Sequence, residues 1–284
     1  VVTVLCILGL HWAGMDWFDA VMHAFTTMGL GGFSSHDASF GHWNSPAIEA
    51  VTIVFMLLAG MNFATMFLAL YGRSFQPYMR DPEVRWFMGI TAASVLGIAI
   101  YLWAMGTYPE FLTALRHSAF NVVSIATTTG YASVDYNLWP MFAPLWMLFL
   151  CSFATSAGST GGGIKMIRAI ILYKQVYREL IRSMHPNVVW PVRIGGDPVP
   201  QNILFAVLAF AFVYMCSIAT MTLLLSFSGL EIITAFSAVV ASINNTGPGL
   251  NQVGPATTYE VLTDFQTWVC TFAMLLGRLE IFTL

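Results

Sequence analysis

Residues 107–133, "TYPEFLTALRHSAFNVVSIATTTGYAS", lie between two strongly apolar stretches and are themselves too short and too polar to cross a membrane. The segment opens with Thr107 and Glu110, which have the spacing of a helix-capping box, and continues as an amphipathic helical run. It ends in a threonine-rich turn at Gly130. The pattern predicts a short helix that is followed directly by a polar glycine turn.

Two other segments share this order of helix start, amphipathic run and glycine turn. They are "DWFDAVMHAFTTMGLGGFS" at 16–34 and "SGLEIITAFSAVVASINNTGPGLNQ" at 228–252, with turns that end at Gly29 and Gly247. Both begin with a helix-start signal, and an apolar stretch follows each of the three turns. The chain therefore contains an internal repeat of span, short helix, glycine turn and span, in three copies.

The composition is that of a membrane protein. Hydrophobic residues make up 57% of the chain and charged residues 9%, whereas a soluble domain carries about 25% charged residues. Several apolar stretches reach the ~20 residues that cross a bilayer core. We expect an all-α, polytopic membrane protein with spans at 46–72, 84–105, 140–172, 199–227 and 259–284, and the end of another at 1–11.

The stretch at 140–172 would be about 48 Å long as one helix, which exceeds a bilayer core of about 30 Å. It contains "SAGSTGGGIK", residues 156–165. A phosphate-binding loop is excluded because Ile164 stands where that motif needs lysine. Close helix packing through Gly158 and Gly162 is a second interpretation. The favoured one is a broken helix, since non-helical backbone at membrane depth has to line a pore or be buried in protein.

The charges are distributed unevenly. Of the eleven lysines and arginines, seven lie in two connections, which the positive-inside rule places in the cytoplasm: Arg73, Arg80, Arg85, Lys174, Arg178, Arg182 and Arg193. The opposite side carries one basic residue, Arg116, and nine acidic ones, which should attract cations: Asp16, Asp19, Asp37, Glu49, Glu110, Asp135, Glu231, Glu260 and Asp264.

The repeated turns are suited to binding a dehydrated cation. Backbone carbonyls can replace the hydration shell of an ion, and glycine permits the dihedrals that point them inward. The predicted potassium ligands are Thr26, Thr27, Met28, Gly29, Thr127, Thr128, Thr129, Gly130, Asn244, Asn245, Thr246 and Gly247. An intramembrane enzyme would need a nucleophile–base pair or a metal cluster, which the sequence lacks. A structural subunit would tolerate a bulky residue at Gly130, and a pore would not.

The three turns, with "GGFSSHDASFG" at 31–41, "SAGSTGGGIK" and "LLGRLEIFTL" at 275–284, resemble the TrkH and TrkG family of bacterial potassium-uptake proteins, in the Trk/Ktr/HKT superfamily. That resemblance implies four span–short-helix–span repeats around one pore. This chain corresponds to the second, third and fourth, at 1–72, 73–182 and 183–284. The sequence is therefore expected to be a fragment.

The resemblance also implies a gate below the filter. The matching loop is 157–165, and its predicted gating residues are Gly158, Ser159, Thr160, Gly161, Gly162, Gly163 and Lys165. Arg278 matches a family arginine that projects into the pore. Pairing with Glu280 is the alternative role, although residues two apart on a helix face different ways. For Lys165, an interfacial position of the ammonium is an equally open alternative.

Taken together, the sequence predicts potassium uptake across the bacterial inner membrane, without enzymatic activity or a cofactor of its own. A sodium-permeable or sodium-coupled relative is the alternative, and the residues leave both channel-like transport and proton symport open. The resemblance implies membrane lipid as surroundings, a homodimer, and a TrkA-like nucleotide-binding regulatory subunit, with no nucleic acid as partner. The basic loops 73–85 and 174–198 are the predicted docking surface.

Overall fold

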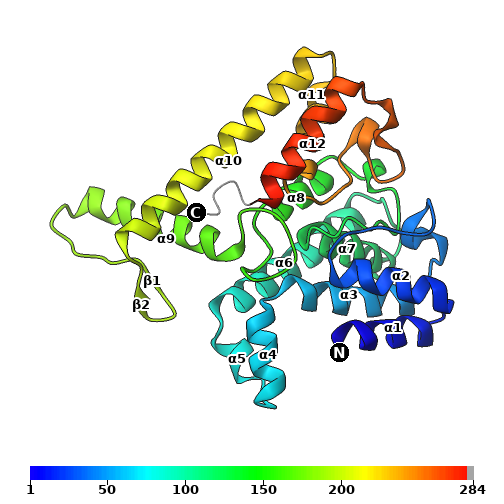
Figure 1. Cartoon of the computed structure of the whole chain (residues 1–284), viewed down its shortest axis with the longest axis horizontal. Helices are drawn as coiled ribbons and strands as arrows, with labels where there is room; N and C mark the ends of the chain where they lie inside the picture. Colours follow the sequence, from blue (N-terminus) through cyan, green and yellow to red (C-terminus); the bar gives the residue numbers. More distant parts are fainter. Residues whose placement is uncertain (280–284) are drawn as a thin grey trace.

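The computed structural model describes residues 1–279, and almost all of its regular structure is helical (Figure 1). Three successive units each contain a first helix, a helix of 12 to 16 residues and a further helical segment. The first unit contains α1 (Val2–Trp12), α2 (Trp17–Met28), the 3₁₀ helix η1 (Ser39–His42), α3 (Pro46–Gly60) and α4 (Phe63–Tyr71).

The second and third units follow the connecting helix α5 (Gln76–Arg80). The second contains α6 (Pro82–Ala104), α7 (Phe111–Ala126), η2 (Tyr136–Leu138), α8 (Phe142–Cys151) and α9 (Met166–Met184). A two-stranded hairpin, β1 (Arg193–Ile194) and β2 (Asp197–Pro198), precedes the third. That unit contains α10 (Gln201–Phe227), α11 (Ile232–Ile243), η3 (Asn251–Val253), η4 (Tyr259–Val261) and α12 (Asp264–Arg278).

Two helices of the described chain, α6 and α10, are long and apolar enough to cross a membrane alone. Together α3 and α4 pass the same test, but they are bent by 102° at the break between them. The span expected at 46–72 is therefore a bent pair of helices and not one continuous helix. The break occurs because the Asn62 side chain caps α4, accepting a hydrogen bond from Ala64 N at 2.8 Å.

The helix starts differ from the predicted capping boxes in two of the three units. Asp16 does cap α2, accepting from Phe18 N at 3.2 Å. The helices α7 and α11 instead begin after Glu110 and Glu231, neither of which makes a side-chain cap bond. In the third unit α10 extends so far that Ser228 ends it, and the Ser228 hydroxyl donates to Leu225 O at 2.6 Å. Local spacing cannot show where a preceding helix stops.

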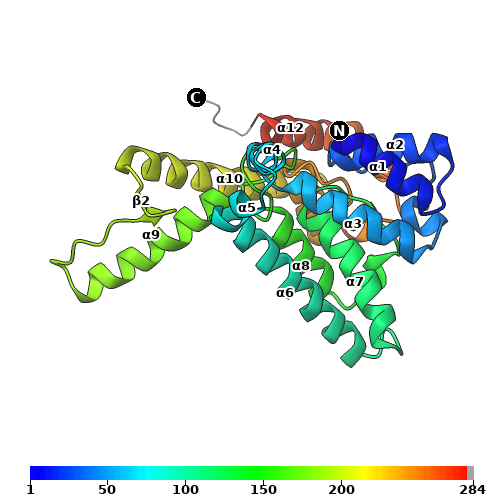
Figure 2. The same ribbon diagram turned by 90° about the horizontal axis from the view of Figure 1, so that it is seen from below.

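The C-terminal half of α7 and most of α11 are buried, whereas α2 lies at the edge of the molecule beside α1 and exposes Phe18 and Phe25 (Figures 1 and 2). Polar side chains of α7, including Asn121 and Ser124, are fully buried. The outer helix α10 exposes large apolar side chains such as Phe205 and Phe212, at 65% and 70%. Polar groups inside and apolar groups outside are the arrangement expected for a protein whose solvent is lipid.

The helix α9 behaves differently from the other long helices. It is amphipathic and extends away from the short helices toward the β1–β2 hairpin (Figures 1 and 2). Between α8 and α9, residues 152–165 are not helical. We call this segment the glycine-rich loop.

Candidate functional site

All three short helices end in the same backbone hydrogen bonds. After α7, Thr128 N donates to Ile125 O at 3.0 Å, and Thr129 N donates to Ser124 O at 2.8 Å. The same pair of bonds follows the other two helices, as Leu30 to Thr27 and Gly31 to Thr26 after α2, and as Asn245 to Ser242 and Thr246 to Ala241 after α11. The three turns therefore have one backbone conformation.

The dihedral angles repeat in the same register. In each turn the second and fourth residues have positive φ: Leu30 (50°) and Gly32 (69°), Thr128 (59°) and Gly130 (87°), Asn245 (54°) and Gly247 (102°). Left-handed backbone is costly for residues with a side chain, so its recurrence at matched positions marks a conformation that the surroundings impose.

These matches correct the first turn. Its structural counterpart to Thr127–Gly130 and Asn244–Gly247 is residues 29–32, and not Thr26–Gly29. The predicted register is wrong by three residues, because "TTMG" resembles "TTTG" while helix α2 continues through Met28. Gly29 itself remains in the turn as its first residue. We refer to 29–32, 127–130 and 244–247 as the glycine turns.

The glycine turns lie against one another in chain order. A Cβ atom on Gly32 would be 2.0 Å from Thr129 O, and one on Gly130 would be 1.9 Å from Thr246 O. Real Cβ atoms do not approach so closely, so only glycine fits at these two positions. A Cβ on Gly247 would meet no described atom within 4 Å.

The side chains around the first turn support it without belonging to it. The Thr27 hydroxyl lies 3.3 Å from the hydroxyl of Tyr131, and the Thr26 hydroxyl is also paired with that phenol. Thr26 further donates to Phe33 O at 3.0 Å. Met28 is the last residue of α2. The three residues assigned to the filter from the sequence thus connect the turn to its neighbour.

Most polar side chains of the other two turns are also occupied by hydrogen bonds. The hydroxyls of Thr127 and Thr129 lie 2.8 Å apart. The Asn244 amide oxygen accepts from the Tyr214 hydroxyl at 2.9 Å, and Asn245 Nδ2 donates to Met274 O at 3.3 Å. The Thr246 hydroxyl is buried and has no hydrogen-bond partner among the described residues. Besides that hydroxyl, the backbone carbonyls are the groups of these turns that are suited to meet an ion.

The glycine-rich loop touches the ends of all three short helices. Thr160 Oγ1 donates to Met28 O at 3.2 Å, and Gly162 N donates to Thr128 Oγ1 at 2.9 Å. A Cβ on Gly162 would be 2.1 Å from Asn244 O. The loop therefore lies directly against the glycine turns, on the side of the short helices' C-terminal ends.

The break between α3 and α4 holds the first part of the loop. Ser156 N donates to Gly60 O at 3.0 Å, and Phe63 N donates to Gly158 O at 3.2 Å. Both groups of the broken helix would otherwise be unpaired at membrane depth, where lost hydrogen bonds are costly. The backbone groups left unpaired at the two helix breaks, at 61–62 and at 152–165, thus form hydrogen bonds with one another.

Two basic side chains contact the loop. Lys165 is buried within the protein, and its ammonium donates to Gly161 O. Arg278 Nη1 donates to Thr160 O at 3.1 Å. The alternative partner of Arg278, Glu280, lies outside the described residues. The packing of Gly158 and Gly162 in a helix contact is excluded, because neither is helical.

One further glycine was missed by the sequence reasoning. A Cβ on Gly277 would be 1.7 Å from Ile243 O, so α12 packs directly on the end of α11. This contact places the following residue, Arg278, beside the loop. In the sequence this contact was marked only by a single glycine in an apolar helix. Such a glycine usually indicates close packing and does not point to a functional site.

The acidic outer side is partly neutralised. Glu49 is buried and its carboxylate accepts from Arg116 Nη2 at 2.7 Å, while Asp19 Oδ2 lies 3.1 Å from the ring of His36. Glu49 therefore serves an ion pair between α3 and α7 and does not add to the field at the outer surface. Within residues 1–279, we find no group of three or more His, Cys, Asp or Glu residues arranged to hold a metal ion.

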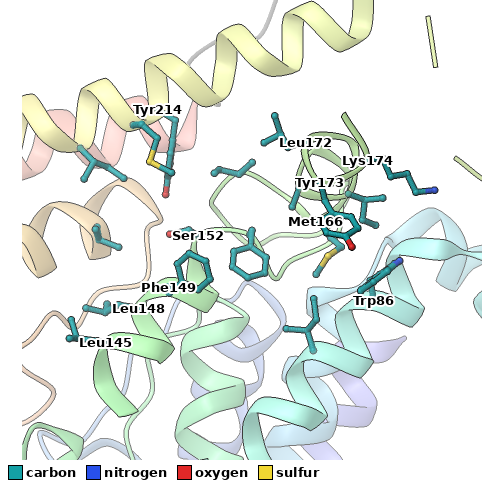
Figure 3. A pocket seen from close by; sticks show the side chains of 18 of the residues that line it. Trp86, Leu145, Leu148, Phe149, Ser152, Met166, Leu172, Tyr173, Lys174 and Tyr214 are labelled. Atoms are coloured by element: carbon teal, nitrogen blue, oxygen red, sulfur yellow. The ribbon is translucent and has the colours of Figure 1, made fainter. Parts of the chain in front are cut away.

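A cavity of about 700 Å³ borders the loop on one side, between α6, α8, α9, α10 and α11 (Figure 3). Its walls are almost entirely apolar, and the loop contributes Ser152, Phe153 and Ile164. Figure 3 shows the hydroxyl of Tyr214 directed toward Ser152. The loop thus has packed glycine turns on one side and open space on another.

Short helices that end at adjoining glycine turns, surrounded by lipid-facing spans, define a membrane pore protein. The chain belongs to the TrkH family, whose model is described as a cation transport protein and matches residues 2–284. It is thus a member of a transporter family and not an enzyme.

The relatives agree with this family. The Trk system potassium uptake protein TrkH of Salmonella typhimurium is 42% identical over 99% of this chain, and TrkG of Escherichia coli is 34% identical over 98%. The crystal structure of the potassium transporter TrkH from Vibrio parahaemolyticus has a TM-score of 0.94 at 39% identity and covers 99% of the chain. The chain spans 57 to 60% of the length of these proteins.

Proposed function

We propose that the three glycine turns form part of a potassium selectivity filter, in a protein that takes up potassium across the bacterial inner membrane. The observation that carries this proposal is the identical backbone of three turns that lie against one another at the ends of short helices. The C-terminal ends of helices carry partial negative charge, which favours a cation at the same place. Relatives named as potassium uptake proteins support the choice of ion.

The backbone carbonyls of 29–32, 127–130 and 244–247 would supply the ligands. The hydroxyl and amide side chains next to them hold the turns in place through the hydrogen bonds described above. In the family, a further repeat supplies another part of the filter, and Gly247, where a Cβ would meet no described atom, presents a surface on which such a turn would fit. The repeat boundaries 1–72, 73–182 and 183–284 are part of this proposal.

The glycine-rich loop is proposed as the gate. It rests against the ends of α2, α7 and α11, so an ion that leaves the glycine turns would meet it next. The adjacent cavity offers volume into which Phe153 and Ile164 can move. The positive charges of Lys165 and Arg278, both bonded to loop carbonyls, would raise the barrier for a cation while the loop is seated.

The basic surface of α9 and the β1–β2 hairpin is proposed to dock a TrkA-like regulatory subunit. Arg178, Arg182 and Arg193 lie on this extension, which leaves the bundle (Figure 2). Such a position allows a cytoplasmic partner to move α9 and with it the loop. A homodimer is proposed on the family resemblance alone.

Deleting residues 158–163 tests the gate. The protein expressed from its complete gene should take up rubidium faster, by roughly tenfold if the seated loop is favoured by about 1.4 kcal/mol. The control is a deletion of equal length in the hairpin, 193–198, measured without the regulatory subunit. Unchanged or slower uptake by a correctly inserted deletion protein would contradict the gate.

A filter that passes sodium as readily as potassium would favour the sodium-permeable alternative.

A further inference from the structure

One buried carboxylate holds both ends of the glycine-rich loop. Glu83 lies in the first turn of α6 with 5% of its surface exposed. Its Oε1 atom accepts a hydrogen bond from Ala157 N at 3.1 Å and another from Ile167 N at 2.9 Å. Ala157 stands near the beginning of the loop, and Ile167 is the second residue of α9.

Helix α9 depends on this contact because its own sequence provides no cap. The residue before the helix is Lys165, with φ of 74°, and it makes no side-chain cap bond. Lysine cannot accept a hydrogen bond, so the first backbone N–H groups of α9 need an acceptor from elsewhere. Thr155 O accepts from Met166 N at 2.7 Å, and Glu83 supplies the acceptor for Ile167 N. The negative charge of Glu83 is favourable at a helix N-terminus.

The position of Glu83 is itself fixed. Asp81 caps α6 by accepting from Glu83 N at 2.9 Å, and its other oxygen accepts from the Thr65 hydroxyl of α4 at 2.8 Å. The backbone of Glu83 is therefore tied through Asp81 to α4, and neither α4 nor α6 belongs to the loop. The loop and helix α9 both bind the Glu83 side chain through a single oxygen atom.

We propose that Glu83 is the positioning residue that couples α9 to the glycine-rich loop. Displacement of α9 draws the shared oxygen along with Ile167 N and away from Ala157 N, so that the loop leaves the glycine turns. A force applied to the distant part of α9 thereby reaches the gate. This inference rests on the loop being the gate, as proposed above.

Two polar substitutions distinguish the contribution of the Glu83 hydrogen bonds from that of its charge. Glu83→Gln keeps an acceptor oxygen at the same distance and removes the charge, and it should leave uptake within about twofold of the unmodified protein. Glu83→Asp keeps the charge but is one methylene shorter, which withdraws the oxygen, and it should raise uptake severalfold, up to about tenfold. The matched controls are Glu110→Gln and Glu110→Asp, at the exposed start of α7.

The loop-deletion protein shows whether Glu83 acts through the loop. Once residues 158–163 are absent, Glu83→Asp should change uptake no further, since the effects of coupled residues are not additive. In the intact loop, a Ser159→Cys probe should react faster with a small thiol reagent when Glu83→Asp is present, in a background without the native cysteines.

The outcomes are distinguishable. If deleting the loop fails to raise uptake, the gate proposal fails. If the deletion raises uptake but Glu83→Asp adds to it, or leaves the Ser159→Cys reaction unchanged, the coupling role of Glu83 is wrong. If Glu83→Gln raises uptake while Glu83→Asp does not, charge and not the shared oxygen holds the loop, and the proposal is overturned.

Discussion

The glycine turns and the glycine-rich loop have similar composition but are held in different ways. Each turn is bonded mainly to its own short helix, through contacts between residues three and five positions apart. The loop has bonds within itself, such as Ile164 N to Ser152 O, and is also bonded to distant residues, including Met28, Thr128 and Gly60. A segment tied to its own helix moves with that helix, whereas the seat of a segment that also bonds to separate elements depends on how those elements lie relative to one another. Glycine content alone does not distinguish a rigid site from a movable one.

The largest effect on uptake is expected from a substitution that disrupts a glycine turn. Gly130→Ala places a Cβ 1.9 Å from Thr246 O at a positive φ that costs roughly 1–3 kcal/mol for a residue with a side chain. Potassium uptake should fall at least about tenfold, with loss of discrimination against sodium. Uptake assays with each ion measure both. Gly97→Ala, in open space on α6, is the control, and an unaffected Gly130→Ala protein would refute a filter at this turn.

A glycine-to-alanine substitution in the loop should have the opposite effect and raise uptake. Gly162→Ala directs a Cβ to 2.1 Å from Asn244 O, so the loop cannot seat against the third turn. Rubidium uptake should rise by roughly tenfold, the change that 1.4 kcal/mol produces. Gly89→Ala, where a Cβ also meets nothing, controls for the added methyl group. A fall in uptake would show that the loop and the turns act as one rigid unit.

A smaller effect is expected from the arginine that contacts the loop. Arg278→Ala removes the hydrogen bond to Thr160 O, and bonds to charged groups contribute about 1.5–3 kcal/mol at most sites. Arg278 is exposed, so we expect uptake to rise only about threefold to tenfold. Arg278→Lys should keep part of the contact and raise uptake less than Arg278→Ala does. Arg182→Ala on α9, measured without the regulatory subunit, serves as control. Uptake equal to that of the unmodified protein would remove Arg278 from the gate.

The smallest effect concerns the support of the first turn. Tyr131→Phe removes the hydroxyl that pairs with Thr26 and Thr27. We expect a loss of about 1 kcal/mol of stability, seen as a lower melting temperature in detergent, with uptake within about twofold. The exposed Tyr173→Phe is the matched control. A loss of ion selectivity instead would mean that these side chains shape the filter directly.

The sequence was sufficient for the repeat and for most of its helices. Apolar length and the recurring turns predicted α6 and α10 to within two residues, because membrane spans and glycine turns depend on local composition. The bend between α3 and α4 was not predictable, since an asparagine in an apolar stretch has several explanations. Its effect depends on Gly60 and Phe63 finding partners in a loop nearly a hundred residues away.

What the amino-acid sequence determined by itself is therefore the membrane class, the threefold repeat and the family, all of which follow from patterns along the chain. The tertiary structure alone decided the register of the first turn, the seat of the loop and the shared acceptor Glu83. These depend on which backbone groups remain unpaired after the helices form, and on which distant atoms lie near enough to satisfy them.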